Sequence, residues 1–97
     1  HRSDFVRAMK SLTGFAALIE ESDPEGARLM RLHVGKTMFF ACKQTILGRQ
    51  GNAREMLRDA RQQGVMPLVF RRYNFRHFLI NRAPALFVLY YRLHKRR

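Results

Sequence analysis

Residues 22–48 read SDPEGARLMRLHVGKTMFFACKQTILG, and this stretch decides the fold. It opens with the strongest helix start in the chain, because Asp23 can cap the first turn, Pro24 suits the first helical position and Glu25 complements the helix dipole. Apolar residues then recur at helical spacing along one stripe: Ala27, Met30, Val34, Met38 and Ala41. Other apolar residues widen this stripe: Leu29, Leu32, Phe39, Phe40, Ile46 and Leu47. We therefore expect one helix that runs to about Gly48 and is buried on most of its sides.

A helix is predicted on either side of this stretch. On the N-terminal side, Ser3 can cap a helix whose apolar residues have helical spacing. These residues are Phe5, Met9, Leu12, Ala16 and Ile19. On the C-terminal side, Asn52 and Glu55 have the spacing of a capping box, and Gly64 is placed to end the helix before Pro67. The residues that this helix is expected to bury are Met56, Leu57 and Ala60.

After Pro67, aromatic and basic residues are interleaved. We expect Phe70, Tyr73, Phe78 and Leu79 to face the core. We expect Arg71, Arg72 and Arg76 to face solvent. Ala83 precedes Pro84, which disfavours helical geometry, so a break is predicted there and a last helix from Ala85 to about Lys95. Because no window alternates cleanly at the period of a strand, the prediction is an all-α fold, a small bundle of four to five helices in a single domain over residues 1–97.

The net charge of +12 is concentrated in the C-terminal part of the chain. Residues 1–59 hold ten basic and seven acidic residues, whereas residues 60–97 hold nine basic residues and no acidic one. Such a one-sided field favours anionic partners, namely phospholipid headgroups or nucleic acid phosphates. The residues predicted to bind an anionic surface are Arg71, Arg72, Arg76, Arg82, Arg92, Lys95, Arg96 and Arg97. An acidic protein partner that neutralises this charge is the alternative.

The last predicted helix is short, apolar and aromatic, with basic residues at both ends. A helix of about 12 residues is only about 18 Å long, too short to cross a hydrocarbon core of ~30 Å. Its pattern is typical of a helix that lies in the headgroup zone, although a core helix with a basic tail would explain it equally well. The residues predicted to lie at the membrane interface are Leu86, Phe87, Leu89, Tyr90 and Tyr91.

The residues that could carry chemistry do not form a recognisable site. The histidines, His1, His33, His77 and His94, have no metal-ligand spacing. Cys42 beside two phenylalanines is predicted to be a buried apolar residue rather than a nucleophile. The run Gly35-Lys36-Thr37 is similar to the end of a phosphate loop, but the upstream glycine and strand are missing. We therefore expect no catalytic residue, no metal, no cofactor and no small-molecule ligand.

Nucleic acid is the rival partner, because a basic and aromatic C-terminal half can also neutralise phosphates and stack bases. No turn places a recognition helix with base-reading side chains, and the apolar run is long for a helix that lies in a groove. A plain protein-interaction bundle with a basic face is the third alternative.

Three local patterns resemble the C-terminal helical region of bacterial family 2 glycosyltransferases of polysaccharide and lipopolysaccharide assembly. His1-Arg2-Ser3 resembles the arginine–serine segment that follows the catalytic domain in that family. Residues 36–40 and 64–67 resemble the helices that come next. Asn81-Arg82-Ala83-Pro84-Ala85-Leu86, followed by Leu89-Tyr90-Tyr91-Arg92-Leu93-His94-Lys95-Arg96-Arg97, resembles the basic and aromatic endings of the family.

The resemblance implies a parent enzyme that transfers a sugar from a nucleotide-sugar, with a divalent metal and aspartates. The chain has no Asp-x-Asp pair, since Asp4, Asp23 and Asp59 are isolated, so no catalytic or metal residue is carried over. The chain begins with His1, and we expect it to be the C-terminal fragment of a longer protein. Its implied role is accessory: it braces the upstream catalytic domain and holds it at the anionic, cytoplasmic face of the bacterial inner membrane.

Overall fold

The computed structural model describes residues 2–48 and 52–95, and the side chains of residues 4–48 and 52–93. Within these ranges the chain forms five α-helices and no strand, which confirms the all-α prediction. The helices are α1 (Arg2–Ile19), α2 (Pro24–Gly48), α3 (Ala53–Gln62), α4 (Phe75–Arg82) and α5 (Pro84–Lys95). α1 includes Arg2, so Ser3 lies inside the helix and not at its cap as predicted.

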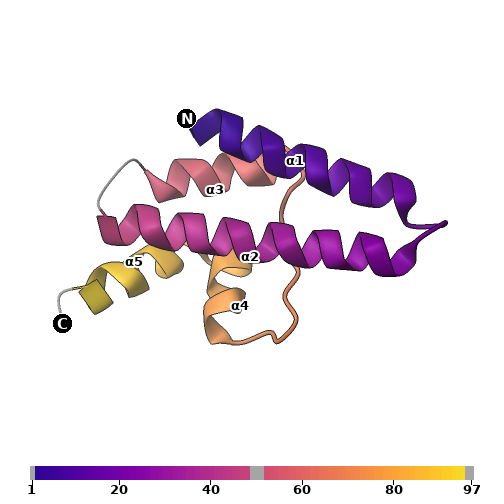
Figure 1. Ribbon diagram of the computed structural model, residues 1–97. Coiled ribbons are helices and arrows are strands. Elements are labelled where there is room, and N and C mark those ends of the chain that lie inside the picture. Colours follow the sequence, from indigo (N-terminus) through magenta and orange to yellow (C-terminus); the bar gives the residue numbers. More distant parts are fainter. Residues whose placement is uncertain (1, 49–51, 96–97) are drawn as a thin grey trace.

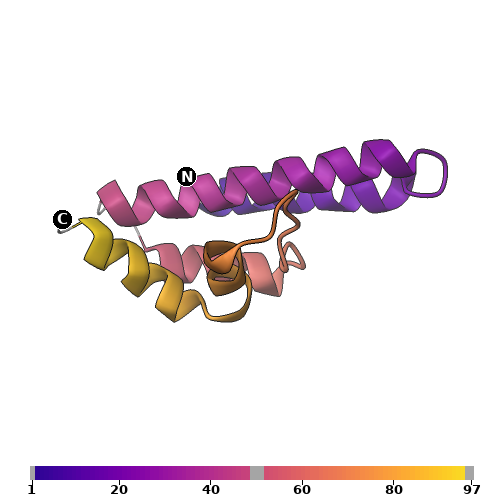
Figure 2. The same ribbon diagram turned by 90° about the horizontal axis from the view of Figure 1, so that it is seen from below.

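The two longest helices, α1 and α2, form an antiparallel hairpin (Figures 1 and 2). α3 packs against both of them, and α5 packs against α2, α3 and α4. The turn between α1 and α2 projects beyond the other helices (Figure 1), which makes the molecule elongated, with extents of 47 × 28 × 18 Å. The three C-terminal helices therefore cover only part of the hairpin.

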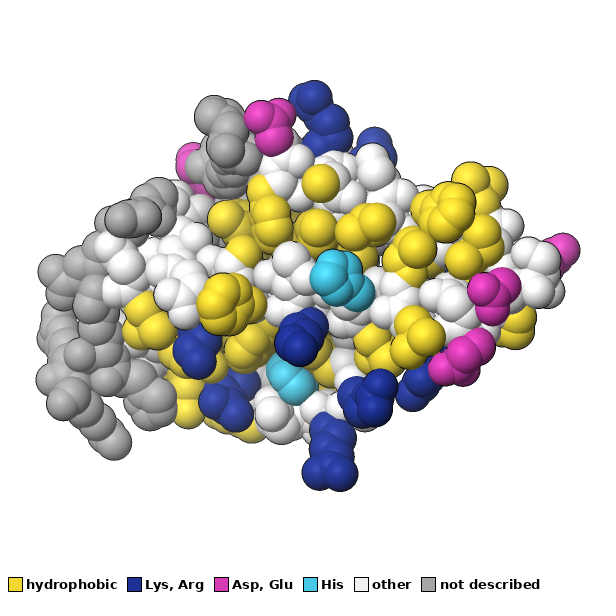
Figure 3. Space-filling model, viewed as in Figure 1, with side chains coloured by type: hydrophobic (Ala, Val, Ile, Leu, Met, Phe, Trp, Pro, Cys, Tyr) yellow, Lys and Arg dark blue, Asp and Glu magenta, His cyan; other side chains and the backbone are white. Residues whose placement is uncertain are grey.

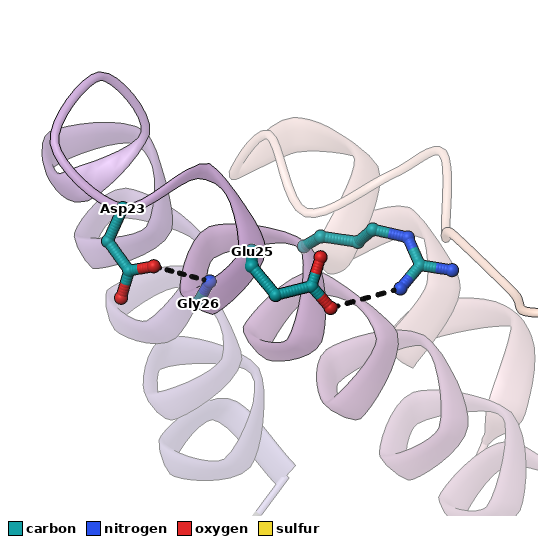
Figure 4. A network of polar contacts seen from close by, with 4 residues as sticks. Asp23, Glu25 and Gly26 are labelled. Atoms are coloured by element: carbon teal, nitrogen blue, oxygen red, sulfur yellow. Dashed lines mark hydrogen bonds and ion pairs between the residues drawn. The ribbon is translucent and has the colours of Figure 1, made fainter.

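The start of α2 has the predicted cap. Asp23 Oδ1 accepts a hydrogen bond of 2.9 Å from the Gly26 backbone N–H (Figure 4), which satisfies a donor of the first turn. Glu25 forms an exposed ion pair of 3.5 Å with Arg28. Asp23 thus caps the helix as the sequence indicated, and Glu25 has a surface ion-pair partner that was not predicted.

The two ends of α3 also follow the sequence. The Asn52 side chain accepts hydrogen bonds from the backbone N–H groups of Arg54 and Glu55, at 3.0 and 3.2 Å. At the other end Gly64 has a φ of +80°, which a side chain would strain. Its N–H donates to the Arg61 carbonyl, and the Val65 N–H donates to the Ala60 carbonyl. These two bonds form a Schellman motif, so Gly64 turns the chain toward α4.

The core lies between the hairpin and the three shorter helices. Its largest fully buried side chains are Phe87, Met38, Ile80, Val6 and Cys42. α2 contributes Ala27, Val34, Gly35, Met38, Cys42 and Ile46 on one side. Leu29 and Phe40 are 48% and 60% exposed, so the prediction that α2 is buried on most sides was wrong. One face of α2 packs on the core, and the face that carries Leu29 and Phe40 is left open.

The segment between α3 and α4 has no regular structure, and the Asn81 side chain holds it in place. Asn81 Oδ1 accepts a hydrogen bond of 2.7 Å from the Leu68 N–H, and Asn81 Nδ2 donates to the Leu68 carbonyl at 2.9 Å. Nδ2 also donates to the Tyr73 hydroxyl at 3.3 Å. We name this arrangement the Asn81 clamp. Since both Leu68 and Asn81 are buried, the clamp satisfies backbone groups that water does not reach.

The core-facing residues of this region were predicted only in part. Leu79 is buried and Phe70 half-buried, but Tyr73 and Phe78 are exposed, which contradicts the prediction. The reason is packing: α4 is short and turns Leu79, Ile80 and Asn81 toward the core. α4 ends at Arg82, and α5 begins at Pro84, which confirms the predicted break.

Candidate anion-binding surfaces

The outer face of α5 carries a stripe of leucines. Leu86, Leu89 and Leu93 are 55%, 49% and 52% exposed, and their spacing of three and four residues puts them on one side of the helix. Arg92 is exposed between the last two. We name the three leucines the leucine stripe.

The inner face of α5 belongs to the core. Phe87 and Tyr91 are buried, so the prediction that they lie at a membrane interface is corrected, and Tyr90 is only half-buried. Lys43 Nζ lies 5.7 Å from the centroid of the Tyr91 ring, a cation–π contact that joins α2 to α5. Burial raises the pKa of the Tyr91 hydroxyl above its ordinary value, and nearby Arg76 opposes this shift. Sequence reasoning missed Leu93, whose spacing from Leu86 was the available signal.

The predicted cationic residues are exposed where their side chains are described. These are Arg71, Arg72, Arg76, Arg82 and Arg92. Lys95 belongs to α5, but its side chain lies outside the description, and Arg96 and Arg97 lie outside the described residues.

A second cationic group, not predicted from the sequence, adjoins the leucine stripe. Arg54, Arg58 and Arg61 of α3 share a groove of about 300 Å³ with Leu86 and the start of α5. Their spacing along α3 is the signal that was available, but Arg54 and Arg58 stand among acidic residues in the sequence and read as an ordinary solvated surface, whereas Arg61 was counted only with the basic residues of the C-terminal part. Arg61 Nη2 donates to the Asn81 carbonyl at 3.2 Å, which ties this group to the Asn81 clamp.

A large concave surface lies between α2 and the segment 68–74, and we name it the basic groove. Its volume is about 960 Å³. The apolar residues that line it are Leu29, Leu32, Phe39, Phe40 and Phe70. The cationic residues are Lys36, Lys43, Arg71 and Arg72. None of the described residues that line it carries a carboxylate. On the face drawn in Figure 3, Lys, Arg and His side chains are interspersed with hydrophobic ones over α2 and α4, and the Asp and Glu side chains lie toward the margins.

Gly35 allows the two walls of the basic groove to meet. A Cβ atom at Gly35 would collide with the backbone carbonyl of Val69, so only glycine permits the segment to pass this close to α2. The Gly35-Lys36-Thr37 run is therefore part of a continuous helix, as the sequence indicated, and its glycine has a packing role. Lys36 is exposed beside this crossing point.

Aromatic rings form the base of the basic groove. Phe70 and His77 are stacked with their centroids 3.7 Å apart, and the Phe39 ring meets both of them edge-on. His77 Nδ1 accepts a hydrogen bond of 3.2 Å from the Asn74 N–H, and the Asn74 side chain in turn accepts from the His77 N–H, which caps α4. Desolvation lowers the pKa of His77, so the ring is neutral at pH 7; a hydrogen bond to the Arg72 backbone opposes this shift and the Arg76 charge adds to it.

Cys42 is not placed for catalysis. It is fully buried, its thiol donates to Met56 Sδ at 3.7 Å, and desolvation raises its pKa to about 12. A thiol with that pKa is protonated at neutral pH and is a poor nucleophile. The described residues include no group of His, Cys, Asp or Glu side chains arranged to hold a metal ion.

Comparisons with protein-family models, curated proteins and solved structures found no match to this chain. None of the described helices is both long enough and apolar enough to span a membrane.

Proposed function

We propose that this domain binds an anionic membrane surface through the leucine stripe and the arginines beside it. The observation that carries the proposal is that α5 presents three half-exposed leucines to solvent, while Arg92 precedes Leu93 and the α3 arginines share a groove with Leu86. An apolar stripe flanked by cations suits the headgroup zone, where leucines enter the acyl boundary and arginines meet lipid phosphates.

The expected affinity is that of a reversible, peripheral contact. Burying the remaining half of each leucine contributes about 1 kcal/mol. Each arginine near an anionic leaflet contributes about 1 kcal/mol as well. The sum is comparable with that of one acyl chain, which binds membranes only marginally. Such a contact suits a domain that assists a neighbouring one at the membrane.

The first experiment is co-sedimentation with vesicles. We expect the chain to sediment with vesicles that contain phosphatidylglycerol and much less with pure phosphatidylcholine. The double variant Leu86→Ser/Leu93→Ser and the variant Arg92→Glu should each release it, because they remove apolar burial and headgroup attraction respectively. Leu18→Ser and Arg7→Glu make single changes of the same two kinds on the exposed surface of α1 and should have no effect.

Equal sedimentation with both kinds of vesicle would remove the electrostatic part of the proposal. Equal losses in the α1 controls would show that total charge, and not this face, controls the binding. Saturable binding to DNA or RNA with a steep salt dependence, in the absence of vesicle binding, would replace the membrane with nucleic acid as the partner.

We further propose that the domain is the accessory C-terminal part of a bacterial glycosyltransferase, positioned at the cytoplasmic face of the inner membrane. The support is the resemblance around residues 81–93, and the leucine stripe lies in that same region. The test is the gene that encodes the chain: an α/β region with an Asp-x-Asp pair upstream of His1 would support the role. An upstream region of another kind would overturn it and leave the membrane proposal standing.

A further inference from the structure

We propose that the basic groove is a binding site for one amphiphile, an apolar chain that ends in a phosphate or carboxylate. This site is separate from the leucine stripe and does not depend on the proposed function. It also departs from the expectation that the chain has no small-molecule ligand. The shape, the charge and the aromatic packing of the groove all favour such a ligand.

One face of α2 is left open along the basic groove. Leu29, Lys36, Phe40 and Lys43 follow one another at intervals of seven, four and three residues, so they lie along one side of the helix. The core uses the other side of α2. A helix in a soluble domain normally has one apolar face, so a second one suggests that something covers it.

The charge of the basic groove selects an anion. Lys36 and Lys43 come from α2, and Arg71 and Arg72 from the opposite wall. With no carboxylate among the described lining residues, these cations have no neutralising partner inside the groove. Guanidinium groups on one side and ammonium groups on the other are a suitable setting for a phosphate or carboxylate head.

The aromatic packing favours an aliphatic chain over stacked bases. One face of Phe70 and one face of His77 are covered by each other, and the edge contacts of Phe39 place its ring inside the base of the groove. Among the described residues that line the basic groove, Phe40 is the aromatic side chain that is well exposed, whereas single-stranded nucleic acid binds best on several open rings. Leu29 and Leu32 extend the apolar wall about two turns beyond Lys36, which suits a chain better than a base.

The volume fits one molecule and not a bilayer. Ligand pockets usually measure roughly 300–1,000 Å³, and the basic groove has about 960 Å³. Its two walls are fixed against each other by the Gly35–Val69 approach and by the Asn81 clamp, so the groove is formed before any ligand arrives. A preformed site loses less entropy on binding than one that must first be ordered.

The test is calorimetric titration with dodecyl phosphate below its micelle-forming concentration. Dodecyl maltoside has the same chain with a neutral head, and inorganic phosphate has the head without the chain. We expect saturable one-to-one binding of dodecyl phosphate and at least about tenfold weaker binding of the other two. Equal binding of inorganic phosphate would show simple anion binding, and equal binding of the maltoside would show simple apolar adsorption; either result overturns the proposal.

Two exposed positions in the groove have matched controls on α1. Lys36→Glu and Leu29→Ser should each weaken dodecyl phosphate binding by about tenfold, since each removes one half of the recognition. Lys10→Glu and Leu18→Ser make the same changes on α1 and should leave the affinity unchanged. Circular dichroism of each variant checks that the helices are intact. The assignment to the groove is contradicted if the α1 variants lose binding as the groove variants do, or if neither the groove variants nor the α1 variants lose it.

Two further arms separate this site from its rivals. Leu86→Ser/Leu93→Ser should retain dodecyl phosphate binding, and Leu29→Ser should retain vesicle binding, so either proposal can fail alone. A twelve-nucleotide oligothymidylate should not displace dodecyl phosphate. If the oligothymidylate displaces dodecyl phosphate at a concentration below that of dodecyl phosphate itself, the groove is assigned to nucleic acid and the proposal is overturned. Vesicles of phosphatidylglycerol distinguish the two sources of such a ligand. Competition with the soluble probe would indicate membrane lipid, and lack of competition would indicate a free amphiphile.

Discussion

Asn81 shows how much one buried amide can organise. Its side chain replaces the sheet or helix partner that Leu68 lacks, and its own carbonyl receives Arg61. The segment that it holds carries Arg71 and Arg72, so the geometry of the basic groove depends on a residue that does not line it. In the sequence Asn81 looked like the polar edge of an apolar run, and nothing marked it as buried.

We predict that Asn81→Ala lowers the free energy of unfolding by about 2–3 kcal/mol, because it leaves the buried N–H and carbonyl of Leu68 without partners. Urea denaturation followed by circular dichroism measures this change. Gln44→Ala, on the exposed surface of α2, is the control and should change stability by less than about 0.5 kcal/mol. A loss of that small size in Asn81→Ala would show that the clamp contributes little.

At the scale of the helices, local sequence signals determine where a helix begins and ends, whereas packing determines which of its faces is buried. Pro24, Asn52, Gly64 and Pro84 are short-range signals, and each one marks an observed helix end. They act within one turn of the chain, which is why these helix ends could be predicted from the sequence.

Which face of each helix is buried could be predicted less well than where the helix begins and ends. Leu29 and Phe40 are as apolar as Met38, and only the position of α1, α3 and α5 decides which of them is buried. The prediction that Tyr73 and Phe78 face the core was wrong for the same reason. The cationic residues of the C-terminal half could be predicted as a group, but Lys36 and Lys43 join Arg71 and Arg72 only through the fold.

The close approach of α2 to the segment 68–74 predicts that alanine changes the free energy of unfolding in opposite directions at two glycines of the hairpin. Gly35→Ala should lower the free energy of unfolding by about 1–3 kcal/mol, because the added Cβ collides with the Val69 backbone. Gly14→Ala lies inside α1 with nothing within 4 Å of the new Cβ. It should raise stability by about 0.5–1 kcal/mol, since alanine favours helix over glycine. Thermal denaturation of both variants measures the contrast, and shifts of the same sign would contradict the close approach.

At the scale of the whole molecule, Cys42 reports on global opening. Its thiol is fully buried at the centre of the core, so a maleimide should react only when the molecule unfolds. We predict a labelling rate in native buffer at least about a thousandfold below that in urea, in line with a few kcal/mol of stability. Mass spectrometry follows the reaction. Rapid labelling of the native protein would show that the core around α2 opens locally.

The projecting turn between α1 and α2 has a practical consequence. It stands clear of α4 and α5 (Figure 2), and Glu21 is exposed there. Since the native thiol of Cys42 is buried, a cysteine introduced as Glu21→Cys would be the accessible attachment point for a fluorophore among the described residues. The hairpin thus provides a labelling site from which the orientation of the domain on a supported bilayer can be measured, without a label on either cationic surface.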